Sequence, residues 1–180
     1  MTIWTTTFES PLGPLLLMSD GTSLCGVHTD NDKHRPTVQS DWILDDSVAP
    51  FPQTIAQLRA YFVGELTEFD LPLGPRGTEF QITVWRELCN IPYGETISYA
   101  ELARRIGRPT ASRAVGHSNA RNPISIIVPC HRVIGADHSL TGYASGLDRK
   151  RMLLEHEAHR ATVRKQESGW VRRQLALDGM

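Results

Sequence analysis

The stretch from Asn122 to Val133 contains the residues best suited to chemistry. A run of apolar residues ends at Pro129, and Cys130, His131 and Arg132 follow directly. The run predicts a buried strand whose end presents the reactive side chains. A thiol with its ordinary pKa of about 8.5 is mostly protonated at neutral pH, so a nucleophilic Cys130 needs a base. His131 is the obvious candidate for that base.

Adjacent side chains on a strand point to opposite faces, so we expect a water molecule to connect His131 with Cys130. A third group should orient the imidazole. Two acidic residues, Glu155 and Glu157, lie on a helix expected to start near Asp148, and the spacing leaves both open.

The remaining cysteines, Cys25 and Cys89, are interpreted as structural, because cysteine is among the most buried residue types. Three cysteines without a CxxC pair indicate neither a disulfide framework nor a four-ligand zinc module. We expect no metal and no other cofactor.

The composition is that of a globular protein with a core. The chain has 180 residues, of which 40% are hydrophobic, enough for one domain or two small ones. Its longest apolar run, Leu15 to Met18, is far shorter than the roughly 18 residues of a membrane span. The first ten residues lack the basic start of a signal peptide. A cytoplasmic protein without membrane contact is therefore expected.

Charge is distributed unevenly along the chain. Residues 1–75 contain three basic residues against ten acidic ones, a net charge of -7. Residues 96–132 contain six arginines against Glu101, a net charge of +5. A basic segment attracts nucleic-acid phosphates, whereas the acidic third would repel them. We expect the first part to support the second without binding DNA itself.

The N-terminal third predicts a small antiparallel sheet followed by a helix. Ile3 to Phe8 and Leu15 to Met18 have strand composition, and Asp20-Gly21 is a hairpin signal. The polar residues 31–50 suggest a surface loop. Ile55, Leu58 and Phe62 recur at helical spacing, with Gly64 placed to end the helix and residues 71–75 as a linker.

The rest of the chain predicts short helices. Thr78 with Gln81 and Ser98 with Glu101 form two capping boxes, and a third helix is expected from Ala111 to about Asn119. The last two helices have the outline of a helix-turn-helix. The expected fold is α/β (α+β): an N-terminal sheet with a helix at 1–75, a mostly helical, winged helix-turn-helix-like domain at 76–160, and a basic tail of unknown structure at 161–180.

Several segments together resemble one known family. The run Ile127 to Gly135, with Pro129-Cys130-His131-Arg132 inside it, closely resembles the active-site motif of the O6-alkylguanine-DNA alkyltransferases. Further similar segments occur in family order: 94–99, 112–116, 122–123, 142–143 and 153–157, with a weaker likeness at 10–13.

The resemblance implies direct, stoichiometric DNA repair. Cys130 would take the alkyl group from guanine O6, or from thymine O4, in a flipped nucleotide of duplex DNA, and each molecule would react once. His131 would accept the thiol proton through water, with Glu157 behind it. Tyr99 would donate a proton toward guanine N3, and Asn122 would tie the helix-turn-helix to the active-site strand.

The same resemblance assigns the surroundings of Cys130. Arg113 would enter the base stack, and the recognition helix would lie in the minor groove, where its small side chains suit close contact. The expected DNA-binding residues are Arg113, Ser112, Ala114, Gly116, Arg121 and Thr96, and the expected pocket residues are Val133, Tyr143, Ala144, Ser145 and Pro129. A monomer in solution is expected, with cooperative assembly on DNA left open.

Two segments depart from the family pattern. Ala144-Ser145-Gly146 places a serine where the family commonly has glycine, which predicts poorer acceptance of bulky substrates such as O6-benzylguanine. The tail at 161–180 has no counterpart. The alternatives are a DNA-binding damage sensor or regulator with the same fold, a cysteine hydrolase, and a structural or redox protein.

Overall fold

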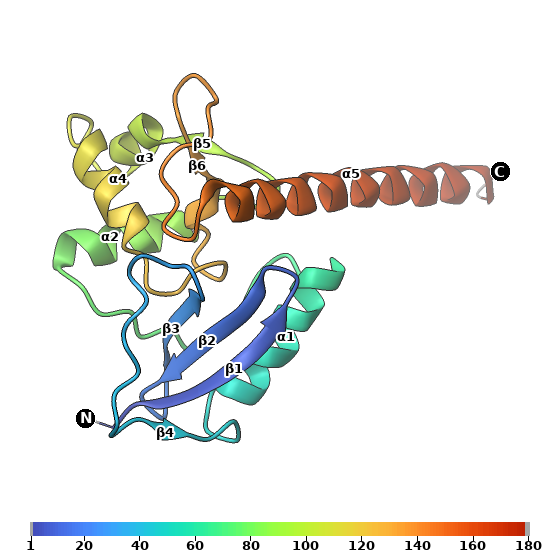
Figure 1. The fold of residues 1–180 in the computed structure, drawn as a ribbon. Coiled ribbons are helices and arrows are strands. Elements are labelled where there is room, and N and C mark those ends of the chain that lie inside the picture. The colour runs from blue at the N-terminus through green and yellow to red at the C-terminus, as the bar shows by residue number, and fades with distance from the viewer. Residues whose placement is uncertain (1, 179–180) are drawn as a thin grey trace.

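The computed structural model describes residues 2–178, and side chains as far as residue 163. Its N-terminal part is a four-stranded sheet in the order β3-β2-β1-β4 (Figure 1). The strands are β1 (Trp4–Ser10), β2 (Gly13–Ser19), β3 (Leu24–Thr29) and β4 (Ile43–Leu44). The first three pair antiparallel, as the sequence predicts, and β4 pairs parallel to β1.

Strand β4 lies inside the segment expected to be a surface loop. It consists of two residues, and it is held by Ile43 N–H, which donates to Ile3 O at 3.0 Å. Two residues are too few to show the alternation by which a strand is predicted from sequence. This part of the loop prediction was therefore wrong.

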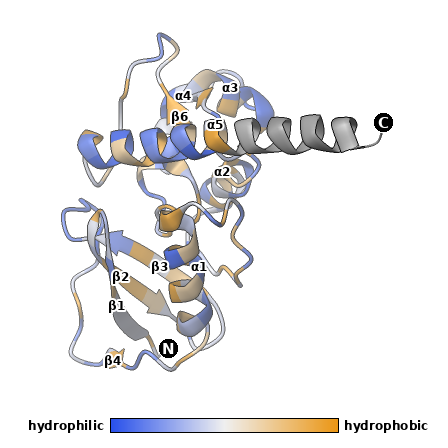
Figure 2. Cartoon of the chain, turned by 90° about the vertical axis from the view of Figure 1, so that its right-hand side faces the viewer, coloured by the Kyte–Doolittle hydropathy of each residue, from blue (hydrophilic) through white to orange (hydrophobic). Residues whose placement is uncertain are grey.

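Helix α1 (Phe51–Val63) covers the sheet, and its Phe51, Thr54, Leu58 and Tyr61 are buried. It ends where the sequence predicts, because Gly64 adopts the left-handed conformation with φ 80°. Hydrophobic and hydrophilic segments alternate along α1 (Figure 2). Its apolar residues join one core that continues into the C-terminal part of the chain.

The C-terminal part is mostly helical. It contains α2 (Glu79–Leu88), α3 (Tyr99–Arg105), α4 (Ser112–Ala120), the 3-10 helix η1 (Cys130–Arg132) and α5 (Leu147–Asp178), with β5 (Ile97–Ser98) parallel to β6 (Val133–Ile134). The Thr78 capping box is confirmed, and Ser98 Oγ accepts from Glu101 N–H. Helices α3 and α4 lie beside each other over α2, as in a helix-turn-helix (Figure 1).

The apolar segment before Cys130 is not the predicted strand. Apart from one bridge between Ile124 and Val27, it folds into turns, with Val128 N–H donating to Ile124 O. Ile126 takes a positive φ of 75°, which a strand does not allow. Because the segment is buried between the two parts of the chain, local turns satisfy its backbone groups. An apolar run does not distinguish these turns from a strand.

Helix α5 starts one residue before Asp148, close to the predicted position, and its backbone continues through the segment expected as a separate tail (Figure 1). The side chains beyond residue 163, including Trp170, lie outside the described part. None of the described helices combines the length and the apolar character needed to cross a membrane.

Candidate active site

Two asparagine side chains fasten the segment that carries Cys130. Asn122 Nδ2 donates to Val128 O at 2.8 Å, and its Oδ1 accepts from Ile124 N–H at 3.0 Å. Asn119, in the last turn of α4, donates from Nδ2 to Cys130 O at 3.2 Å. The helix expected to face DNA is thus joined directly to the reactive segment. The resemblance assigns this connection to Asn122, whereas the direct contact from α4 is made by Asn119, which no sequence motif marks.

Cys130 is 3% exposed and lies at the start of η1. Burial raises the pKa of the thiol to about 11, although the hydrogen bond with Asn122 and the charge of Lys150 act in the opposite direction. At neutral pH the group is therefore a thiol, and its use as a nucleophile requires a base at the moment of reaction.

His131 is fully buried, and its Nε2 lies 2.8 Å from Glu157 Oε1. Burial lowers the pKa of the imidazole, and the hydrogen bond with Glu157 offsets part of that effect. Because an ionised carboxylate is purely an acceptor, Nε2 must carry the hydrogen of the neutral ring. Nδ1 is then the acceptor, and it has no hydrogen-bond partner among the described residues.

Glu157, and not Glu155, is the acidic residue that forms a hydrogen bond with His131 Nε2. Glu155 is exposed on α5, whereas Glu157 is completely buried. Burial opposes ionisation of Glu157, but hydrogen bonds and charges from His131 and Arg132 outweigh it and lower the pKa of the carboxyl well below its ordinary value. The carboxylate is ionised throughout the neutral range.

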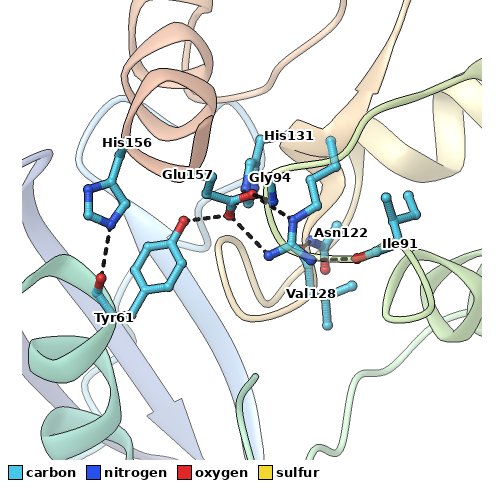
Figure 3. A network of polar contacts seen from close by, with 9 residues as sticks. Tyr61, Ile91, Gly94, Asn122, Val128, His131, His156 and Glu157 are labelled. Atoms are coloured by element: carbon cyan, nitrogen blue, oxygen red, sulfur yellow. Dashed lines mark hydrogen bonds and ion pairs between the residues drawn. The ribbon is translucent and has the colours of Figure 1, made fainter. Parts of the chain in front are cut away.

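Further groups surround the same carboxylate (Figure 3). Arg132 donates from Nε to Oε2 at 2.9 Å and from Nη2 to Oε1 at 3.0 Å. Gly94 N–H reaches Oε2 at 3.1 Å, and the Tyr61 hydroxyl reaches Oε1 at 2.7 Å. No sequence signal marks Tyr61, because nothing in the spacing connects α1 with α5. Arg132 is one of the six arginines of the basic segment 96–132, yet it is buried and its charge is paired with Glu157 rather than exposed to solvent.

Tyr99 opens α3 and lies beside the loop that precedes α5. Its hydroxyl donates to Thr141 O at 3.1 Å or to Gly142 O at 3.3 Å. Burial raises the pKa of the phenol, so it remains a proton donor at neutral pH. A Cβ at Gly142, which has a φ of +58°, would lie 2.9 Å from the Tyr99 hydroxyl. A side chain there would push Tyr99 out of place.

Lys150, for which no sequence motif predicts a role in the site, holds this loop. It is fully buried and donates from Nζ to Val133 O and Thr141 O, both at 2.6 Å. Burial lowers the pKa of its ammonium group to about 8. A lysine so close to the start of a helix resembles an ordinary surface residue in sequence, so no local signal could have found it.

The expected pocket residues lie on two segments. Pro129 and Val133 flank η1, and Tyr143, Ala144 and Ser145 follow the loop held by Lys150. Tyr143 and Ser145 are 8% and 4% exposed, and their hydroxyl oxygens have no partner among the described residues. Ala144 O accepts from Lys33 N–H at 3.4 Å, which connects this loop with the N-terminal sheet region.

Five of the six residues expected to bind DNA lie on α4 or directly after it. Arg113 and Ala114 are exposed in its first turn, and Arg121 is exposed directly after it. Ser112 and Gly116 are half-buried, and Gly116 lies against the ring of Tyr99. Thr96, exposed before β5, is the sixth of these residues.

Comparisons with known proteins match both parts of the chain. Residues 79–159 match the model of the 6-O-methylguanine DNA methyltransferase DNA-binding domain, and residues 3–75 match that of the ribonuclease-like domain of the same proteins. A methylated-DNA–protein-cysteine methyltransferase of Methanosarcina acetivorans is 55% identical over 150 residues, covering 83% of this chain and 95% of that protein. A protein of the same name from Mycobacterium bovis is 52% identical and covers 86% of this chain and 92% of its own.

Solved structures agree with these matches. Mycobacterium tuberculosis OGT in complex with DNA has a TM-score of 0.79 and 50% identity, covering 89% of this chain and 94% of that one. A crystal structure of the Mycobacterium tuberculosis O6-methylguanine methyltransferase has a TM-score of 0.80 and 51% identity, covering 88% and 94%. The similarity extends over both parts of the fold.

Proposed function

This chain belongs to the 6-O-methylguanine DNA methyltransferase family and repairs DNA by moving an alkyl group from the damaged base to a cysteine of its own, and we propose that this cysteine is Cys130. The observation that carries the proposal is a buried thiol followed directly by a buried histidine whose Nδ1 has no hydrogen-bond partner within the described part of the chain. Cys25 and Cys89 instead direct their thiols to backbone carbonyls, those of Ser23 and Trp85, each at 3.5 Å.

The transfer itself is a displacement at the alkyl carbon. The Cys130 thiol loses its proton, by way of a water molecule, to Nδ1 of His131, and the sulfur then forms a bond with the alkyl carbon as its bond to guanine O6 breaks. Glu157 accepts from Nε2, so it holds the ring in the required tautomer and stabilises the imidazolium that forms. Nothing in this sequence of steps regenerates the thiol, so each molecule reacts once.

Tyr99 supplies the proton for the leaving base. Its phenol stays protonated at neutral pH and donates to backbone carbonyls of the loop at 141–142. When guanine occupies the pocket, the hydroxyl turns from a carbonyl to guanine N3, and the base leaves as a neutral molecule. A neutral leaving group lowers the barrier to displacement.

Alkylated duplex DNA binds along α4. The damaged nucleotide must leave the stack, because its O6 atom is inaccessible to a buried thiol while the base is paired. Arg113 fills the space it leaves, and Ser112, Ala114, Gly116, Arg121 and Thr96 contact the surrounding strands in the minor groove. Residues 1–75 support residues 76–160, and the protein works as a cytoplasmic monomer.

The test of this proposal is intact-mass spectrometry after the protein is mixed with an excess of an O6-methylguanine duplex. We expect a gain of one methyl group per chain, located on Cys130 by peptide mapping and saturating at one equivalent. Cys130→Ser, which keeps the size of the side chain, should gain none. Methylation of Cys25 or Cys89 in the wild-type protein would refute the assignment.

The experiment also separates the alternatives. A binding protein that senses damage without chemistry would retain the duplex with no change in mass. A cysteine hydrolase would convert substrate in excess over protein. The proposed reaction predicts neither outcome, since the methyl group stays on the sulfur.

Ser145 is expected to limit the size of the alkyl group. Its side chain is buried two residues after Tyr143 in the segment expected to line the pocket, and removing a small obstruction in an apolar pocket changes discrimination by about 10-fold or more. We expect Ser145→Gly to accelerate the reaction with O6-benzylguanine by that factor while methyl transfer from a duplex stays within about twofold of the wild-type rate. Equal benzyl rates in the two proteins would contradict this role.

A further inference from the structure

A tyrosine of the N-terminal part reaches the carboxylate that orients His131. Tyr61 lies in the last turn of α1, and its hydroxyl is 2.7 Å from Glu157 Oε1, the same oxygen that accepts from His131 Nε2 (Figure 3). Both side chains are fully buried. Burial and the charge of Glu157 keep the pKa of the phenol well above its ordinary value, so the hydroxyl is a permanent donor.

The ring of Tyr61 is held in place from several sides. It packs against Phe69 and edge-on against Phe62 and Tyr93, at centroid distances of 5.4, 5.3 and 6.0 Å. His156, next to Glu157 on α5, lies 5.3 Å from the same ring and its Nε2 is 2.9 Å from Tyr61 O. Two consecutive residues of α5 are therefore fixed against one residue of α1.

We propose that Tyr61 is a positioning residue for alkyl transfer, through which the N-terminal part sets the basicity of His131. The inference rests on the proposed function of His131 as the base. Oε1 of Glu157 accepts from Tyr61, His131 and Arg132 together. Each donor partly neutralises the negative charge of the carboxylate. The hydrogen bond from the Tyr61 phenol therefore reduces the stabilisation that Glu157 gives to protonated His131. His131 therefore stays neutral, and able to accept the thiol proton, at lower pH.

The other titratable and charged groups around this cluster belong to several elements. Arg132 comes from η1 and also lies over the ring of Tyr93 at 5.7 Å, His156 comes from α5, and Lys150, at the start of α5, acts on His131 through its charge. The Tyr61 hydroxyl bonds Glu157 Oε1, so we expect these groups to remain in place when it is removed and a change in Tyr61→Phe to report on that hydroxyl.

The test compares the pH dependence of single-turnover methyl transfer in the wild-type protein and in Tyr61→Phe. We expect the acid limb of the rate profile to move to higher pH by at least about half a unit in the variant, because the carboxylate then stabilises the imidazolium more strongly. The NMR titration of the His131 ring nitrogens in unreacted protein should move in the same direction. Affinity for the duplex should not change.

Leu58→Ala is the matched control. Leu58 lies on the buried face of α1, one turn before Tyr61, and contributes to the core. We expect Leu58→Ala to lower the melting temperature at least as much as Tyr61→Phe does. The pH dependence of its methyl-transfer rate should be that of the wild-type protein. An unchanged profile in Tyr61→Phe, or an equal shift in Leu58→Ala, would overturn the inference. If wild-type Cys130 gained no methyl group, the proposed function would fail instead, and the NMR titration would still report on Tyr61.

Discussion

Replacing Glu157 by glutamine is expected to lower the free energy of unfolding by about 3–5 kcal/mol at pH 7, because Arg132 would keep its buried charge without a counter-ion. The same change should slow methyl transfer by about 100-fold or more, since a neutral amide stabilises the imidazolium of His131 poorly. Urea denaturation measures the first effect, and single-turnover kinetics on an O6-methylguanine duplex measure the second. Glu155→Gln is the matched control, because Glu155 is exposed on the same helix.

The loss of stability should depend on pH with a defined sign. The pKa of Glu157 is lowered by folding from its ordinary value of 4.5, so its ionisation contributes stability that is fully present above that pH. This contribution disappears as the pH falls through the folded-state pKa, and the difference between wild type and Glu157→Gln should shrink below pH 4.5. A difference that stayed constant down to pH 3 would show that the carboxylate does not carry the effect.

Replacing Arg113 by alanine should separate binding of the damaged duplex from chemistry at Cys130. Arg113 is exposed in the first turn of α4, away from the buried cluster, so its removal leaves the fold intact. Without the Arg113 side chain to fill the gap in the DNA base stack, the complex with the flipped-out nucleotide is destabilised by a few kcal/mol. This slows methyl transfer from a duplex by on the order of 100-fold. Transfer from the free O6-methylguanine base, which needs no flipping, should keep its wild-type rate.

Arg121→Ala is the control variant for Arg113→Ala. Arg121 is exposed beyond the end of α4, and a phosphate contact there would affect affinity in a salt-dependent way with little effect on the rate at saturating duplex. Equal slowing of Arg113→Ala on the duplex and on the free base would contradict its role in flipping.

Much of this molecule follows from short-range patterns. The capping residues Thr78 and Ser98, the end of α1 at Gly64 and the antiparallel pairing of the first strands were all predictable, because each depends on residues a few positions apart. The prediction that Cys130 and His131 act as nucleophile and base also depends on short range, since the two residues are neighbours in the chain.

The tertiary structure decided which groups surround Cys130 and His131. Tyr61 and Glu157 are 96 residues apart and Arg132 and Glu157 are 25 apart, and spacing along the chain predicts neither contact. The choice of Glu157 over Glu155 depends on which face of α5 meets η1, and the turns at 122–129 depend on burial between the two parts of the protein. Local sequence determines local backbone preferences, whereas the protonation state of a buried group depends on every charge that folding brings near it.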